Sequence, residues 1–211
     1  MTMPPKISDK TRETILNSAW DLMAEQRRLD AGMAEIAAAA GVTRQSVFYA
    51  FGNRAGLLVA MARHRDTRSD HVQRMGALAA GAGADLATLQ AYVDVWLDYL
   101  PIIYPVAIQL EAASLTDTDA DAAWRDRMFD QGLRLGLDLI IRRMATAGAL
   151  AEGQDADHAA DLCQTWLLPS AWRYLVVERG WTPAAFAASR HDLLKSLFKT
   201  RRVRASGRSS A

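Results

Sequence analysis

Cysteine, histidine and long apolar runs are scarce in this 211-residue sequence, and each scarcity excludes a class of protein. The single cysteine, Cys163, cannot form an intramolecular disulfide, which argues against a disulfide-stabilised secreted domain and suits a reducing cytosol. No apolar stretch approaches the roughly 20 residues that cross a bilayer. The segment MTMPPKISDK lacks the apolar core of a secretory signal. We therefore expect a cytoplasmic protein with no membrane partner, in which Cys163 is a small buried residue.

Patterns that bind metals or phosphates are also missing. The sequence has no HExxH, no paired-cysteine metal site and no glycine-rich phosphate loop. Its four histidines are scattered over separate expected helices. An enzyme needs a convergent set of titratable groups, and nothing in the sequence points to one. We expect no catalytic site, no metal and no cofactor, and an enzyme is only a remote alternative.

Charge is unevenly distributed, although the net charge is only +1. Residues 1–65 carry nine Lys/Arg and six Asp/Glu, whereas residues 66–194 carry ten and eighteen. The tail from Lys195 onward has six basic residues and no acidic ones. A basic head on an acidic body suits a protein that presents one end to a polyanion. Ordinary scatter of solvated charge would look similar, so the charges alone do not decide.

Proline is infrequent, with six residues, and alternating apolar residues are almost absent, which disfavours strands. Apolar residues instead recur at helical spacing and predict an all-α fold. Helical segments are expected after Ser8–Asp9, near 33–40, after Thr43, over 54–80, 85–100, from the prolines at 101 and 105 to about 115, 120–147, 155–179 and 183–200. Pro169 lies inside the penultimate segment and should bend it. Whether the bend opens space beside Trp166 or follows a filled core is left open.

The second and third segments form the first functional pattern. Gly41 ends the short second helix, and Thr43 can cap the third, in which Val47 and Phe51 face inward. Two short helices joined by a glycine-containing turn, with polar residues outward on the second, are typical of a helix-turn-helix. We therefore expect the third helix to enter the major groove of double-stranded DNA.

The same residues resemble a known family. The stretch TRETILNSAWDLMAEQ and the run MAEIAAAAGVTRQSVFYAFGNRAGLL resemble the DNA-binding domain of the TetR (tetracycline-repressor) family over about residues 10–62. Beyond residue 65 the resemblance is limited to helix number and length. It implies an N-terminal three-helix helix-turn-helix domain and a larger helical effector and dimerisation domain. The expected divisions are residues 1–53, 54–200 and a disordered basic tail over 201–211.

The resemblance assigns candidate DNA contacts position by position. Arg44 has the chemistry to donate to guanine and Gln45 to pair with adenine, whereas Tyr49 and Arg54 suit phosphates. The alternatives are that Phe48 is partly core and that Arg44 is a solvated charge. Gly32 replaces the usual Ser/Thr cap of the second helix and leaves Glu35 as half of a capping box. The candidate DNA contacts are Thr43, Arg44, Gln45, Ser46, Phe48, Tyr49 and Arg54.

Most aromatic residues follow residue 85, in the larger domain. Aromatic cavities between helices are common ligand sites, yet aromatics at helical spacing more often fill a core. The family resemblance favours a pocket for a small, mainly apolar or aromatic effector. The residues expected to line it are Trp96, Leu100, Tyr104, Met128 and Trp166.

The last two helices carry apolar residues that suit a four-helix interface between two copies of the chain. Packing within one copy is the alternative. The candidate interface residues are Leu162, Phe186, Leu193, Leu194 and Leu197.

The function expected from these features is a DNA-binding transcriptional regulator, a homodimer on a palindromic operator. We expect a repressor that a small-molecule effector releases. A DNA-binding regulator or architectural dimer without an effector is the alternative, and a filled core in place of a cavity would favour it.

Overall fold

The structure is a computed structural model that describes residues 7–198, and within this range it is all-helical, which confirms the expected fold class. An isolated bridge pairs Leu150 with Phe198. The helices are α1 (Asp9–Trp20), α2 (Met33–Ala39), α3 (Arg44–Phe51), α4 (Arg54–Asp66), α5 (His71–Ala80), α6 (Leu86–Ala113), α7 (Thr118–Arg125), α8 (Leu133–Thr146), α9 (Ala156–Trp166), α10 (Pro169–Trp172) and α11 (Pro183–Leu197). Three π-helical segments continue α1, α7 and α10, namely η1 (Asp21–Glu25), η2 (Asp126–Asp130) and η3 (Arg173–Glu178).

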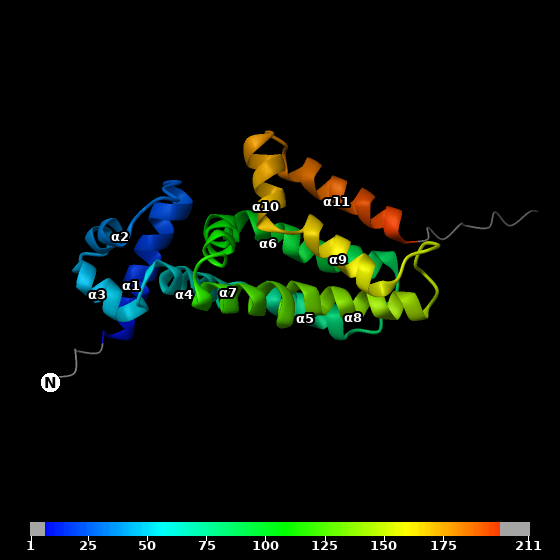
Figure 1. The fold of residues 1–211 in the computed structure, drawn as a ribbon, viewed down its shortest axis with the longest axis horizontal. Coiled ribbons are helices and arrows are strands. Elements are labelled where there is room, and N and C mark those ends of the chain that lie inside the picture. The colour runs from blue at the N-terminus through cyan, green and yellow to red at the C-terminus, as the bar shows by residue number, and fades with distance from the viewer. Residues whose placement is uncertain (1–6, 199–211) are drawn as a thin grey trace, which may run out of the picture.

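The helices form an elongated molecule with a small domain at one end (Figure 1). Helices α1, α2 and α3 make up this end, and α4 leads from them into the larger domain. Helices α5 and α8 pack together on one side of α6, and α9 to α11 lie on the other side in Figure 1. The predicted boundary after residue 53 falls at the Asn53 cap of α4. The predicted tail over 201–211 lies outside the described residues, as do residues 1–6 and the end of the second predicted domain.

Helix α6 is the core of the larger domain and packs against α4, α5, α7, α8, α10 and α11. We expected it to break at Pro101, but it runs unbroken through Pro101 and Pro105. Buried residues on both sides of the prolines, such as Val95 and Val106, hold one continuous helix in the core. By length and composition alone α6 could cross a membrane, contrary to our expectation, but its apolar side chains are those of the core.

Three segments predicted as continuous helices are divided. The segment over 54–80 breaks between α4 and α5, and the one over 120–147 breaks at Gln131–Gly132. A Cβ on Gly132 would lie 1.5 Å from the Arg127 carbonyl oxygen, so only glycine fits this turn. Pro169 starts α10 and divides the third segment, as its missing N–H requires. These breaks turn α5 and α8 towards each other beside α6.

The small domain is fixed by local signals and a shared core. The Ser8, Thr43 and Asn53 side chains each accept a hydrogen bond from the first turn of the helix that they precede. Gly41, with φ +65°, follows the end of α2, as predicted. In place of a side-chain cap, Glu35 Oε2 accepts from the Gly32 N–H at 3.1 Å, the expected half of a capping box.

Helices α3 and α4 approach closely at Gly56. A Cβ there would lie 2.0 Å from the Phe51 carbonyl oxygen, so a side chain would push α4 off the end of α3. In α5, by contrast, a Cβ on Gly76 would meet nothing within 4 Å.

Gly56→Ala is expected to lower the free energy of unfolding by about 1–3 kcal/mol, because the clash is with backbone. Gly76→Ala is the matched control and should raise it by about 0.5–1 kcal/mol through helix propensity. Urea denaturation followed by circular dichroism measures both. Equal effects of the two substitutions would contradict the close approach of α3 and α4.

Candidate nucleic-acid interface and ligand pocket

Helix α3 is anchored by its first turn and its inner face. Thr43 Oγ1 accepts from the Ser46 N–H at 3.1 Å, and the Thr43 and Ser46 hydroxyls lie 2.9 Å apart. Val47 and Phe51 are buried in the core of the small domain, as predicted from their spacing. This inner face fixes which residues of α3 point outward.

The outward face of α3 carries Arg44, Gln45, Phe48 and Tyr49, all exposed. Phe48 and Tyr49 are 58% and 51% exposed, an unusual position for two adjacent large aromatics. Gln45 Nε2 donates to the Tyr49 hydroxyl at 2.7 Å, so these two side chains are held along one ridge of the helix. An exposed ridge of polar and aromatic groups on a short helix matches what a major groove accepts.

Arg54 does not belong to this face. Its guanidinium points inward, donates to the Ala31 carbonyl, and donates from Nη2 to the Leu29 carbonyl at 2.7 Å and to Gln109 Oε1 at 3.1 Å. Burial lowers the Arg54 pKa, and the carbonyl acceptors compensate for the lost solvation. Three of its five N–H donors are therefore used within the chain, and this inward orientation disfavours the phosphate contact that we expected.

The small domain meets the larger one at this residue, which sequence reasoning did not anticipate. Gln109 of α6 joins Arg54 in donating to the Leu29 carbonyl. Beside them, Asn53 Nδ2 donates to Asp117 Oδ2 at 3.0 Å, so the capping residues of α4 and α7 are linked. The only sequence signal was that both Asn53 and Asp117 precede helix starts. These contacts fix the angle at which α3 is presented.

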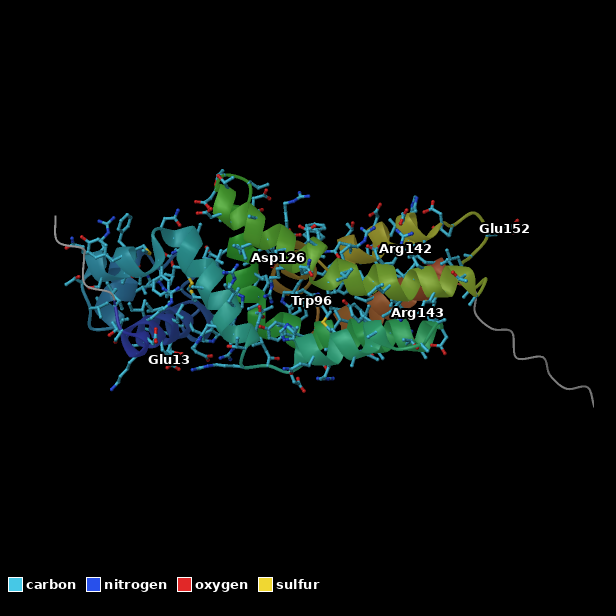
Figure 2. All side chains as sticks on the ribbon, turned by 90° about the horizontal axis from the view of Figure 1, so that it is seen from below. Glu13, Trp96, Asp126, Arg142, Arg143 and Glu152 are labelled. Carbon is cyan, nitrogen blue, oxygen red and sulfur yellow. The ribbon has the colours of Figure 1, made fainter. Side chains whose placement is uncertain are left out.

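A pocket of about 440 Å³ opens between α4, α5, α6, α8 and the turn at η2. Figure 2 shows Trp96 in the interior between these helices, with Asp126 nearby. Its volume is that of a site for a small organic molecule. The apolar part of its wall consists of Val59, Ala62, Val72, Met75, Gly76, Ala79, Ala80, Trp96, Leu110, Ala123, Leu133, Leu135, Gly136 and Leu139.

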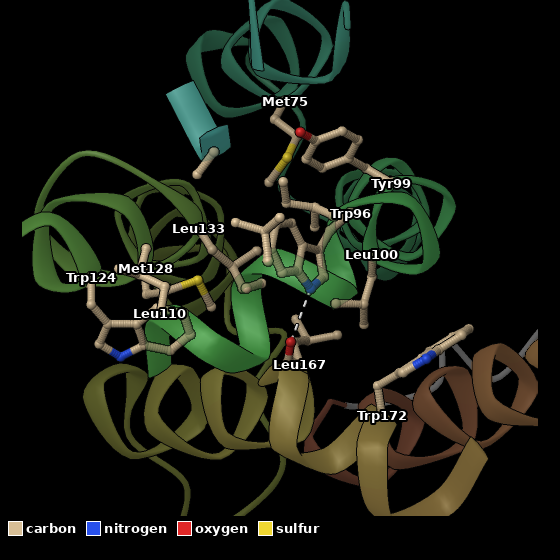
Figure 3. Packing of buried hydrophobic residues seen from close by; sticks show 14 of the residues in the cluster. Met75, Trp96, Tyr99, Leu100, Leu110, Trp124, Met128, Leu133, Leu167 and Trp172 are labelled. Atoms are coloured by element: carbon tan, nitrogen blue, oxygen red, sulfur yellow. Dashed lines mark hydrogen bonds between the residues drawn. The ribbon is translucent and has the colours of Figure 1, made fainter. Parts of the chain in front are cut away.

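Of the residues predicted for an effector pocket, Trp96 lines this one and four do not. The Trp96 Nε1–H donates to the Leu167 carbonyl at 2.9 Å, which fixes the indole between Leu133 and Leu167 (Figure 3). Leu100 and Met128 are fully buried in the core, while Tyr104 and Trp166 are partly buried. The pocket therefore lies on the α5–α8 side of Trp96, towards Met75, and away from α9 and the Pro169 bend.

A polar cluster closes one end of the pocket. Asp66, the last residue of α4, forms an ion pair with Arg127 and accepts from the Tyr99 hydroxyl at 2.7 Å. The His71 ring stacks on Tyr99 with centroids 3.6 Å apart, and burial lowers the His71 pKa to about 4. At neutral pH His71 is therefore uncharged. The cluster joins α4, α5, α6 and η2 at a single point.

Comparison with known proteins gives the family of the small domain. Residues 15–61 match the family model of bacterial regulatory proteins of the tetR family. This match covers 47 of the 211 residues, so the small domain is similar to the DNA-binding domain of that family. None of the curated proteins matches this chain.

Solved structures share the TetR fold over nearly the whole chain. The fatty acid degradation regulator FadR from Bacillus halodurans has a TM-score of 0.64 at 19% identity, covering 90% of this chain and 96% of its own. SmeT, the repressor of the Stenotrophomonas maltophilia multidrug efflux pump SmeDEF, has 0.64 at 20%, covering 90% and 91%, and has also been solved with triclosan. A regulator from Saccharomonospora viridis in complex with choline has 0.66 at 20%, covering 92% and 100%.

The C-terminal helices pack differently from our expectation. The Phe186 ring meets Trp172 edge-on, with centroids 5.1 Å apart, and the Arg190 guanidinium lies 4.3 Å from the Phe186 centroid. Phe186, Leu194 and Leu197 are buried within their own copy, so they cannot be surface residues of a dimer interface. Leu162 and Leu193 are half-buried and stay available to a partner.

Arg54→Ala is expected to lower the free energy of unfolding by about 1–3 kcal/mol, because it removes charged hydrogen bonds to buried acceptors. Arg44→Ala, at an exposed site ten residues earlier, should leave stability unchanged. Urea denaturation of both variants tests this. Unchanged stability of Arg54→Ala, together with a weaker salt dependence of DNA binding, would restore the phosphate role.

Proposed function

We propose that this chain is a sequence-specific transcriptional repressor that binds a palindromic DNA operator as a homodimer and is released by a small effector. The observation that carries the proposal is the outward face of α3, where exposed Arg44, Gln45, Phe48 and Tyr49 stand on a helix anchored from its inner side. The match of residues 15–61 to the tetR-family model supports the same function. We expect it to act in the cytoplasm, where operators are located.

The chemistry of α3 supports base reading as well as positioning. Arg44, at the first turn, has the reach and donors for guanine O6 and N7, and Gln45 has the amide pattern that pairs with adenine. Tyr49 restrains Gln45 through their hydrogen bond, which reduces the entropy that Gln45 would lose on binding. Thr43 and Ser46 at the helix start suit backbone phosphates, since a helix N-terminus favours anions.

The pocket supports release by an effector, whereas a filled core would have favoured the effector-free alternative. It is bounded by Asp66 at the end of α4, and the start of α4 carries the joint with the small domain. An effector that binds the DNA-incompetent arrangement more tightly would lower operator affinity. The fold neighbours solved with triclosan and choline are consistent with effector binding in this fold.

The corner between η3 and α11 supports the dimer. Tyr174, Val177 and Trp181 are all exposed there, at 57%, 58% and 40%, whereas large apolar residues elsewhere on α9 to α11 are mostly covered. Together with half-buried Leu162 and Leu193, they provide apolar surface of the kind that forms the centre of an interface. This corner lies on the upper edge of Figure 1 and leaves the small domain free to bind DNA.

Gln45→Ala and Arg44→Ala are each expected to cost about 1–3 kcal/mol of operator binding and to relax preference at one position per half-site. Duplexes selected from a randomised DNA library, and measured by fluorescence anisotropy at several salt concentrations, provide the test. Arg142→Ala is the control, because it removes a similar charge at the far end of the molecule (Figure 2). Unchanged sequence preference in both α3 variants would contradict the assignment.

Trp181→Glu is expected to yield monomers that keep their helicity and lose operator binding, because a buried unpaired charge opposes the interface. Leu115→Glu changes an even more exposed leucine, 84% accessible, in the turn after α6, and should remain dimeric. Sedimentation velocity at micromolar concentration compares the two with the wild-type chain. A wild-type monomer, or a dimeric Trp181→Glu, would overturn the proposed interface.

A further inference from the structure

We propose that the pocket takes an uncharged, mostly apolar molecule whose single hydrogen-bond acceptor, such as a ketone oxygen, binds the Arg127 guanidinium. This inference deepens the proposed function and rests on it only in treating the pocket as an effector site. It is carried by the shape of the apolar wall, by an unmet donor at the polar end and by the balance of charge around it.

The apolar wall of the pocket favours a ligand whose larger part is apolar. Met75, Ala79, Trp96 and Leu133 line the interior and are buried (Figure 3). At the mouth the wall continues through exposed side chains, so the apolar surface reaches solvent. Covering such surface favours binding by about 25 cal/mol per Å². The exposed residues at the mouth are Val72, Leu135 and Leu139.

The polar end has one donor without a partner, whereas each Asp66 oxygen already accepts a hydrogen bond. Arg127 donates through Nη1 to Asp66 Oδ2, while its Nε–H is buried and has no acceptor among the described residues. Both oxygens of Asp66 are already occupied, Oδ2 by Arg127 and Oδ1 by the Tyr99 hydroxyl. An unmet buried donor costs about 1–3 kcal/mol. A ligand that brings an acceptor to this guanidinium therefore gains binding energy, and one that brings another donor does not.

Charge balance at the Arg127 end of the pocket disfavours an ionic head. The charged side chains around the pocket are two cations, Arg63 and Arg127, and two anions, Asp66 and Asp126. His71 faces the same point and is neutral, because burial lowers its pKa to about 4. A carboxylate beside Asp66 would place two anions on one buried guanidinium, and an ammonium at the same point would face the Asp66 oxygens, which already have partners. Either charge would be left without full compensation at the buried end.

The test compares three probes with the same carbon chain: 2-nonanone, nonanoate and nonylammonium. Isothermal titration calorimetry of the full chain at pH 7 measures their affinities. We expect 2-nonanone to bind at least tenfold more tightly than either ion. Tighter binding of nonanoate or nonylammonium, or no binding of any probe, would overturn the inference.

Two variants test whether 2-nonanone binds in this pocket. Gly76→Leu adds a large side chain to the pocket wall at a position where a Cβ meets nothing within 4 Å, and it should abolish binding of 2-nonanone. Ala77→Leu adds the same side chain at the next, exposed position of α5, outside the pocket wall, and should bind like the wild type. Equal affinity of these two variants for 2-nonanone would overturn the site.

A third variant tests the acceptor. Asp66→Asn together with Arg127→Met removes both buried charges at once, so neither is left unpaired. This variant should lose the preference for 2-nonanone over nonane by about tenfold, the value of one hydrogen bond to a charged donor. A retained preference would assign the ketone oxygen to another group and overturn the role of Arg127.

The same probes separate this inference from the proposed function. If 2-nonanone binds in the pocket and operator affinity is unchanged, release by an effector fails while the ligand class stands. If the chain binds its operator normally and all three probes fail to bind, the ligand class falls while DNA recognition stands.

Discussion

An arginine guanidinium at each end of α4 links this helix to other parts of the structure. At its start Arg54 donates to backbone carbonyls of the small domain and to Gln109 of α6, and at its end Asp66 is held by Arg127. The orientation of α3 depends on the first contact, and the polar end of the pocket depends on the second. Because α4 is a single helix of 13 residues, displacement at one end is transmitted to the other as rigid-body motion.

The Arg54 and Arg127 sites compensate in different ways for the free-energy cost of burying a charge. Arg54 forms no ion pair with the described residues, although the nearby Asp30 acts on it electrostatically, and three of its donors bind neutral oxygens. The site is therefore directional and sensitive to the position of residues 29–31. Arg127 has a formal partner in Asp66 and a donor left over. Removing one member of such a pair leaves a buried charge, which costs more than removing both. The Arg54 site is therefore suited to fixing the orientation of the small domain. The Arg127 site is suited to exchanging one hydrogen-bond acceptor for another.

Local signals were sufficient to predict the small domain, and distant contacts were not. Thr43 as a cap, Gly41 after α2 and the inward pair Val47 and Phe51 all depend on residues a few positions apart, and the structure has each of them. The inward turn of Arg54 depends on Gln109, 55 residues away. The sequence pattern of a basic residue at a helix start is the same whether the residue binds a phosphate or a distant amide. The pattern therefore could not distinguish these two roles for Arg54. The burial of Leu194 likewise depends on which neighbour covers α11.

A pocket in the larger domain was predicted, but at another position. The prediction relied on aromatic residues, whereas glycine and alanine residues form part of the observed wall. The wall that α5 and α8 contribute includes Gly76, Ala79 and Gly136, none of which carries a recognisable sequence signal. Gly136 is required there, because a Cβ would lie 2.1 Å from the Tyr92 hydroxyl oxygen. That hydroxyl donates to the Leu133 carbonyl at 2.9 Å and so pins α6 to α8. Hydrogen bonds to backbone carbonyls fix Tyr92 and Trp96 in the wall of the pocket. The polar cluster at Asp66 differs, because Arg127 can exchange a hydrogen-bond partner there. A ligand would therefore change α4 most readily through its head group, at Arg127.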